Sequence, residues 1–283
     1  MNNNLLHGAG LGLRREMLDE VLPDIPPEID FWEVAPENWI PLGGKYQHQL
    51  EAFSQNTQFV NHGLSLSIGS FDPLDIKFIK EIKSFLDRHN VIYYSEHLSY
   101  CSGNGHMYDL MPIPFTEEAV RHVVERIQIV QDILKRPLVL ENVSYYAAPG
   151  QDMTELDFTL EVLKRSGGLL LLDVNNIYVN SINHGYNATA FLQALPSDKI
   201  AYGHIAGHYD EAEDLKVDTH GADVIQPVWS LLEQAYQFHG VFPTLLERDF
   251  NIPSIDELIQ EVNKIKAIQS KISQQKNGAK EYS

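Results

Sequence analysis

Histidine and acidic side chains stand at the ends of short apolar runs in this sequence. Six consecutive runs end in this way, with the polar residues Asn61-His62, Glu96-His97, Glu141-Asn142, Asp173-Val174-Asn175-Asn176, His204 and Glu247-Arg248-Asp249. Imidazole nitrogens and carboxylate oxygens together suit Fe, Mn or Zn better than Ca or Mg. Crowded carboxylates repel one another unless a cation compensates them, so the six runs together predict a metal centre.

Taken singly, each of these residues also has an ordinary structural interpretation. A lone His62 or His97 is more often a hydrogen-bonded histidine than a metal ligand. A lone Glu141 can equally form a salt bridge or cap a following helix. The repetition on six runs favours the metal centre over these alternatives.

Two short spacings between residues 204 and 221 add further candidates. His204 and His208 are four residues apart, as in a helical zinc-protease motif, but the motif's Glu is absent and Gly207 disfavours a helix. We therefore exclude that motif. Asp218 and His220 are alternate residues of an expected loop, and in extended backbone such residues point to one side and can share a metal ion.

Two other signals do not carry the function. The run Gly8-Ala9-Gly10-Leu11-Gly12 resembles a dinucleotide-binding loop, but its third glycine comes one residue too early for that motif. We predict a tight strand-to-helix turn there. Cys101 is the single cysteine, so it forms no internal disulfide, and we expect it to be a bystander rather than a reactive thiol.

The elements that must position these residues alternate between strands and helices. Apolar runs predict eight strands at 5–10, 30–35, 57–62, 91–97, 137–142, 168–174, 200–205 and 243–248. Apolar residues at three- and four-residue steps predict helices at 75–89, 116–134, 154–165, 188–195, 224–238 and 254–268, with shorter ones at 14–22 and 46–55. This alternation predicts an α/β fold, a (β/α)8 barrel, whose strand ends meet at one mouth. We expect residues 1–270 to form this single domain and residues 271–283 to be a polar, frayed tail.

The composition excludes several classes of protein. Hydrophobic residues make up 43% of the chain, which is enough for a large folded core. No apolar run reaches the length of about 20 residues that a membrane span needs, and the start lacks the features of a signal peptide, which predicts a cytoplasmic protein. The formal net charge of −18 repels polyanions, so we expect neither nucleic acid nor membrane among its partners.

Seven segments resemble the multinuclear non-haem iron-dependent oxidases, a family that includes the methanobactin-biosynthesis oxidase. They are FWEVAPENW at 31–39, NHGLSLSIG at 61–69, SEHL at 95–98, LENV at 140–143, LDVNNIYVN at 172–180, HIAGH at 204–208 and DTHG at 218–221. The resemblance implies a xylose-isomerase-like TIM barrel with two or three iron ions. It further implies that O2 is used to modify cysteine, or another residue, of a ribosomally made precursor peptide, and that a small helper protein presents this peptide.

The same segments are similar to the trinuclear apurinic endonucleases, and this similarity implies a ligand set for each ion. The first ion takes His62, His97 and Glu141, the second takes Glu141, Asp173, His204 and Glu247, and the third takes Asn176, Asp218 and His220. Asn176 stands where the endonuclease pattern has a histidine, and a neutral amide binds a divalent ion more weakly, which weakens the third site. Further groups near the ligands are expected to support or replace them, namely Asn142, Asn175, His184 and His208.

Two other functions compete with the oxidase. The first is a hydrolase or isomerase, including a nuclease, that uses the same ligands without redox change. Against a nuclease, the sequence has no basic stripe, and near the strand ends the arginines are confined to Arg14, Arg15 and Arg248. The second is a noncatalytic peptide- or metal-binding module, which intact ligands on six strands disfavour.

Overall fold

Eight parallel strands form a closed barrel in the computed structural model, which describes residues 6–103 and 105–281. The strands follow one another around the barrel in the order β1-β12-β9-β8-β7-β4-β3-β2. Their bounds are β1 Ala9–Gly12, β2 Phe31–Val34, β3 Gln58–Gly63, β4 Tyr94–His97, β7 Val139–Glu141, β8 Leu169–Asp173, β9 Ile200–Ala206 and β12 Thr244–Glu247. The predicted (β/α)8 fold is therefore confirmed.

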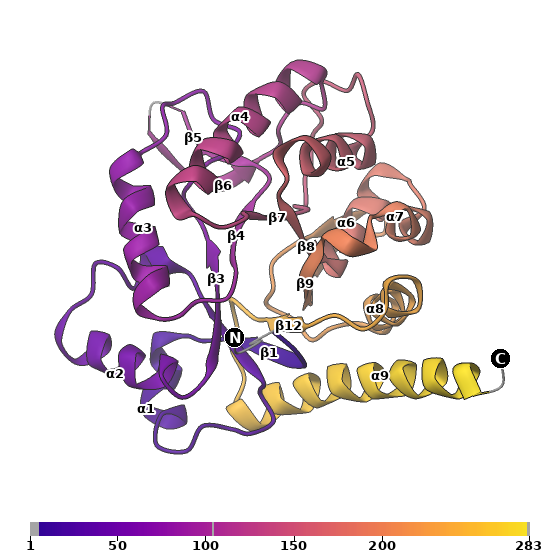
Figure 1. The fold of residues 1–283 in the computed structure, drawn as a ribbon. Helices are drawn as coiled ribbons and strands as arrows, with labels where there is room; N and C mark the ends of the chain where they lie inside the picture. The colour runs from indigo at the N-terminus through magenta and orange to yellow at the C-terminus, as the bar shows by residue number, and fades with distance from the viewer. Residues whose placement is uncertain (1–5, 104, 282–283) are drawn as a thin grey trace. The chain divides into compact units, whose positions relative to one another are not determined.

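Helices connect the barrel strands along the chain (Figure 1). They are η1 Arg15–Met17, α1 Leu18–Val21, η2 Pro36–Asn38, α2 Gly44–Ser54, α3 Ile76–Arg88, α4 Glu117–Leu134, α5 Glu155–Ser166, α6 Val174–His184, α7 Ala188–Ala194, η3 Ser197–Lys199, α8 Gln226–His239 and α9 Ile255–Glu281. Most match the predicted periodic runs, but α6 was not predicted as a separate helix. Among the described helices, none is both long and apolar enough to cross a membrane.

Capping side chains explain where several helices begin. The side chains of Asp75, Thr116, Thr154 and Asn187 each accept a hydrogen bond from a backbone N–H in the first turn of α3, α4, α5 and α7. Asp173 does the same for α6. Such a cap satisfies a donor that has no partner within the helix and is worth about 1 kcal/mol. The caps therefore fix the point at which each chain segment leaves its strand or loop.

The chain divides into two compact units, which we describe separately. The N/C unit comprises the described residues up to Glu33 together with those from Leu172 onward, and the middle unit spans Val34–Leu171. Large buried aromatic side chains anchor the N/C unit, including Tyr202, Trp229 and Tyr236, and α9 packs beside α8 and β1 (Figure 1). The middle unit buries Phe53, Phe59, Tyr94 and Phe158, and its α4 packs against α3 and α5.

Two short antiparallel hairpins lie outside the barrel strands. One is formed by β5 Tyr100–Ser102 and β6 His106–Met111 in the middle unit, directly after β4. The other is formed by β10 Tyr209–Ala212 and β11 Leu215–Val217 in the N/C unit, directly after β9. The sequence analysis did not predict either hairpin, because both are short and β10 is exposed on both faces and lacks an apolar alternation.

The structure corrects two predictions about the ends of the domain. The run Gly8–Gly12 is not a strand-to-helix turn, because Ala9–Gly12 is strand β1 itself. A Cβ on Gly10 would come within 2.4 Å of the Phe31 ring, so glycine allows β1 to pair closely with β2. The tail predicted to fray from residue 271 instead continues α9 to Glu281, and Ile272 is buried. Residues 282–283 of that predicted tail lie outside the described residues.

Candidate metal centre

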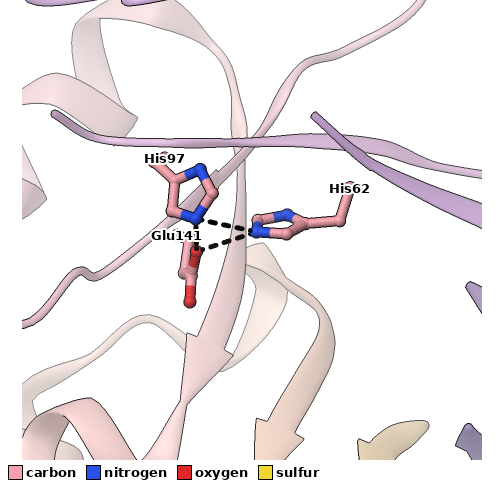
Figure 2. Close-up of side chains that lie close together, drawn as sticks. All are labelled: His62, His97 and Glu141. Carbon is pink, nitrogen blue, oxygen red and sulfur yellow. Dashed lines mark hydrogen bonds and ion pairs between the residues drawn. The ribbon is translucent and has the colours of Figure 1, made fainter. Parts of the chain in front are cut away.

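Three ligand-type side chains converge in the middle unit, at the ends of three adjacent strands. His62 lies on β3, His97 ends β4 and Glu141 ends β7, and the parallel register places His97 opposite Glu141. The Nε2 atoms of His62 and His97 are 3.1 Å apart. Glu141 Oε2 is 3.1 Å from His62 Nε2 and 3.3 Å from His97 Nε2 (Figure 2).

This triangle of atoms has the dimensions of a metal-binding face. Ligand bonds of about 2.1 Å that meet at angles of about 90–105° place two ligand atoms roughly 3.0–3.3 Å apart. Both imidazoles and the carboxylate point to one place in Figure 2, with the two ring centroids 4.3 Å apart. His62 and Glu141 are also buried, so their polar atoms are removed from bulk water. The residues present therefore fit a bound metal ion.

The second ring nitrogen of His62 has a neutral partner. His62 Nδ1 is 2.7 Å from Ser95 Oγ, and Ser95 Oγ in turn donates to the Asn61 carbonyl over 3.3 Å. Because the hydroxyl proton is used on Asn61, Ser95 Oγ accepts from Nδ1–H of His62. The lone pair of His62 is then on Nε2, which faces Glu141 and His97.

Two further acidic side chains hold the loop that follows β3. Glu96 Oε1 accepts from the backbone N–H groups of Ser65 and Leu66, at 3.1 and 2.8 Å. Glu37 Oε1 accepts from the Leu64 N–H at 2.9 Å. Burial, and then the negative charge of Glu96, raise the pKa of Glu37 to about 7. The two side chains thus anchor one loop, and Glu37 is about half protonated near pH 7.

A second cluster lies in the N/C unit. Asp173, His204 and Glu247 each offer one ligand atom, and these atoms lie within 4.8 Å of one another. Glu247 Oε2 is 3.1 Å from Nδ1 of His204. Asp173 also caps α6, since its Oδ1 accepts from the Asn176 N–H at 2.5 Å. All three side chains are buried, which strengthens every electrostatic interaction between them.

His220, in the loop after β11, adds to this cluster. Its Nδ1 is 3.4 Å from Glu247 Oε2 and 3.1 Å from Asp249 Oδ2, while its Nε2 is 2.7 Å from Asp218 Oδ1. His220 has a φ of 51°, a left-handed conformation that non-glycine residues seldom adopt and that clusters at functional sites. The Asp249 N–H donates to the His220 carbonyl over 3.0 Å and helps to hold this conformation.

Charge compensation is strong in the N/C cluster. Burial alone would lower the pKa of His204, but Glu33 and Glu247 raise it well above its usual value. Burial likewise opposes protonation of His220, and Asp218 and Glu247 raise its pKa well above its usual value. Burial would raise the pKa of Glu247, yet the two histidines lower it well below its usual value. Without a metal ion, imidazolium protons therefore take the place of the compensating cation.

The predicted supporting residues fall into two groups. Asn175 donates to Asp218 Oδ1 at 2.9 Å, and its Oδ1 is 2.8 Å from His208 Nδ1, so Asn175 and His208 lie directly behind the ligand-type residues. Asn142 is buried next to Glu141. His184 is instead the last residue of α6, which places it roughly 16 Å along the helix from Asp173.

Two acidic residues of the site were missed by the sequence analysis as ligands or supports. Glu33 Oε2 is 3.1 Å from Nε2 of His204 and accepts from the Tyr202 hydroxyl at 2.8 Å. Asp249 contacts His220 as described and also pairs with Arg14. The available signal for Glu33 was a single acidic residue within an otherwise apolar strand, Phe31–Val34.

A closed (β/α)8 barrel with two buried histidine–carboxylate clusters defines a candidate metal-binding barrel protein. Solved structures share this fold. The "IOLI protein with a binding zinc atom" has a TM-score of 0.64 at 15% identity, over 94% of this chain and 99% of that one. A D-psicose 3-epimerase from Clostridium cellulolyticum H10 has a TM-score of 0.59 at 12% identity, over 95% and 97% of the two chains. At these identities the likeness shows the fold alone.

Sequence relatives define the family. Residues 8–270 match the RiPP precursor modification enzymes MbnB/TglH/ChrH, where RiPP denotes a ribosomally made and later modified peptide. A UPF0276 protein of Shewanella loihica is 65% identical over 266 residues, which cover 94% of this chain and 96% of that one. A UPF0276 protein of Pseudomonas aeruginosa is 49% identical over 269 residues, or 95% of either chain. The chain belongs to this family of peptide-modifying enzymes.

Proposed function

We propose that this enzyme is an iron-dependent oxidase that uses O2 to modify cysteine, or another residue, of a ribosomally made precursor peptide. Membership of the precursor-modifying family supports the peptide substrate. The resemblance to multinuclear iron oxidases supports the redox chemistry, and it also underlies our proposal that a small helper protein presents the peptide.

One observation carries the choice of iron. His62, His97 and Glu141 form a group of two imidazoles and one carboxylate, with their ligand atoms 3.1–3.3 Å apart. A facial set of two histidines and one carboxylate with open positions is typical of non-haem Fe(II) oxygenases. Catalytic zinc sites can use the same ligand set with an open position, so the resemblance to iron oxidases is the second ground for iron. Cys101, the only thiol, instead contacts the Leu64 carbonyl at 3.4 Å and does not belong to this group.

We propose two or three iron ions on the residues named by the sequence. His62, His97 and Glu141 hold the first, Asp173, His204 and Glu247 the second, and Asp218, His220 and Asn176 the third. That Glu141 also serves the second ion stays a prediction. Iron bound at these residues would supply open coordination positions and the redox capacity for O2 chemistry. The chain's own contribution is orientation, with Ser95 fixing His62 and Asn175 fixing Asp218.

Metal analysis under controlled oxygen tests the proposal. Zinc binds such sites more tightly than Fe(II), so the protein is produced in iron-replete medium and purified without oxygen. We expect stoichiometric iron and a change in absorbance when O2 is admitted. The matched control is His97→Ala, which should lose iron at the first site. Protein that contains stoichiometric zinc and shows no response to O2 contradicts the oxidase.

The substrate is tested with a cysteine-containing precursor peptide encoded beside the gene. We expect a mass change in the peptide that requires O2 and iron-loaded protein, with and without any small protein encoded next to it. Turnover by zinc-loaded protein in the absence of O2 would instead support the rival function, a hydrolase or isomerase that uses the same ligands without redox change.

A further inference from the structure

His204 lies between two carboxylates on opposite sides of its ring. Its Nδ1 is 3.1 Å from Glu247 Oε2, and its Nε2 is 3.1 Å from Glu33 Oε2. The carboxylates differ in their surroundings. Glu247 is grouped with Asp173 and His220, whereas Glu33 Oε2 receives the Tyr202 hydroxyl at 2.8 Å. The Nδ1 side of His204 therefore faces the cluster that holds Glu247, Asp173 and His220.

The strands explain why these three groups meet. Tyr202 and His204 are alternate residues of β9, so their side chains point to the same face. Glu33 ends the run of β2 that pairs with β1, with Gly12 as its partner in register. Glu33, Tyr202 and His204 are all buried. Their hydrogen bonds are therefore made in a region where an imidazole has little freedom to change partners.

We propose that Glu33 is a positioning residue for the metal centre: it accepts the Nε2–H of His204 and so leaves Nδ1 as the atom that binds the ion. An imidazole that donates from one nitrogen to a carboxylate is fixed in tautomer and ring orientation, and it becomes a stronger donor to a metal. The inference rests on the proposed metal centre, but it needs neither iron as the native metal nor O2 as the oxidant.

A purely structural role for Glu33 makes a different prediction. Removing one partner of a buried ion pair destabilises the fold, so a loss of stability in Glu33→Leu does not by itself indicate a positioning role. If Glu33 served only packing, Glu33→Leu would leave metal binding unchanged. If it positions His204, Glu33→Leu weakens metal binding even when the protein folds as well as before.

The test measures Zn²⁺ affinity by chelator competition in Glu33→Leu and Glu33→Gln. Loss of such a supporting partner typically lowers metal affinity about 10–100-fold, and we expect this range for Glu33→Leu. Glu33→Gln retains an oxygen that accepts Nε2–H but loses the charge, so we expect a smaller loss, about tenfold or less. Long-range ¹H–¹⁵N NMR of the Zn²⁺-loaded proteins should show a hydrogen-bonded Nε2–H on His204 in the parent and in the Gln variant, and its loss in the Leu variant.

Two backgrounds separate this effect from a general loss of structure. In His97→Ala, which removes the first site, Glu33→Leu should still lower the remaining Zn²⁺ affinity. In His204→Ala, Glu33→Leu should have no further effect, because the residue through which it acts is gone. Thermal unfolding of each variant verifies the fold. Unchanged Zn²⁺ affinity in Glu33→Leu, or an equal loss with and without His204, would overturn the proposal. Failure of the oxidase assay would leave it standing.

Discussion

At the scale of single residues, the groups that face both ring nitrogens together separate the ligand-type histidines from ordinary buried ones. His62 is backed by the Ser95 hydroxyl, His204 by the Glu33 carboxylate and His220 by groups on both ring nitrogens. His89 shows the contrast, because it is buried and also bonded to a serine, Ser54, but belongs to none of the metal-type groups found among the described residues. A ligand is thus recognised by what its two nitrogens face.

Removing the Ser95 hydroxyl should weaken the first metal site. Ser95→Ala takes away the acceptor for His62 Nδ1–H, so the ring gains rotational and tautomeric freedom. We expect metal affinity at this site to fall about tenfold, near the lower end for a lost supporting contact. Zn²⁺ competition measures the change, and the exposed Ser84→Ala is the control. Equal affinities in the two variants would show that Ser95 does not orient His62.

Substitutions of Glu141 and of His220 should deplete different metal ions. Glu141→Gln removes the anionic member of the group with His62 and His97, so the ion there should be lost and the enzyme inactive. His220→Ala should keep that ion, because its contacts are with Asp218, Glu247 and Asp249. Metal content of identically prepared proteins gives the result. If Glu141 bridges two ions, both are depleted together. A Glu141→Gln protein with full metal content and turnover contradicts the assignment.

The ligand-type residues could be predicted from the sequence because they interrupt a pattern of apolar runs. The residues behind them could not, because they lie within such runs and meet only in the folded chain. His62, His97 and Glu141 come where apolar runs end, which is visible in a linear sequence. Glu33 sits beside Trp32 inside a strand, and its partners Tyr202 and His204 are about 170 residues away along the chain. Only the fold of the N/C unit brings them together.

At the scale of elements, the segment after β3 is held by side chains from several directions in the middle unit. Glu37 and Glu96 accept its first N–H groups. Buried Arg126 of α4 donates to the carbonyls of Ser67, Ile68 and Asp72. The segment directly follows His62 and Gly63, so its position supports that of the histidine.

Glu37 should make the stability of the protein depend on pH. Its pKa is raised from 4.5 to about 7 by burial and by Glu96, so between these values the folded state holds a proton that the unfolded state has lost. Stability should therefore fall as pH rises from about 4.5 to 7. Glu37→Gln should be more stable than the parent by on the order of 1–2 kcal/mol at pH 8 and nearly equal to it below pH 5. Urea unfolding at both pH values tests this, with the exposed Glu118→Gln as control. A gain at low pH would reverse the sign and refute the assignment.

Arg126 should contribute strongly to stability. Arg126→Met removes three hydrogen bonds to backbone carbonyls, although Ser67 keeps the Ser70 N–H as a donor, and we expect a loss of about 2–5 kcal/mol in the free energy of unfolding. Arg121→Met on the same helix removes only an exposed pair with Glu117 at 3.7 Å and should cost less than about 1 kcal/mol. Denaturant unfolding compares the two. Similar losses would mean that the guanidinium does not hold the segment.

Elements with strong periodicity were predictable, whereas those defined by tertiary contacts were not. The helix α3 has buried Ile79, Ile82 and Phe85 at helical spacing and a capping Asp75, so its position follows from local sequence. The hairpins β5–β6 and β10–β11 lack such a signal. The helix α9 extends further than predicted because Ile265 and Ile272, seven residues apart, continue its buried apolar face into a segment of mostly polar residues.

At the scale of the whole molecule, the net charge disfavours the rival function of a nuclease. With a formal net charge of −18, duplex DNA should be repelled rather than attracted. We expect no change in the anisotropy of a labelled duplex at moderate salt, corresponding to a dissociation constant weaker than about 10⁻⁴ M. Metal-loaded protein must be tested beside metal-free protein, because bound cations reduce the negative field. Tight binding by the loaded form would favour the nuclease.

The unequal partners of His62 and His204 also set an order in which the sites fill. A hydroxyl backs His62 and a carboxylate backs His204, so His204 is the stronger electron donor to a metal. When metal is scarce, the cluster with His204 should therefore load first. A preparation with one ion per chain would then consist of molecules that all carry the ion at the cluster with His204 and lack it at the other proposed sites. Such a preparation would be inactive even though the proposed enzyme holds two or three ions.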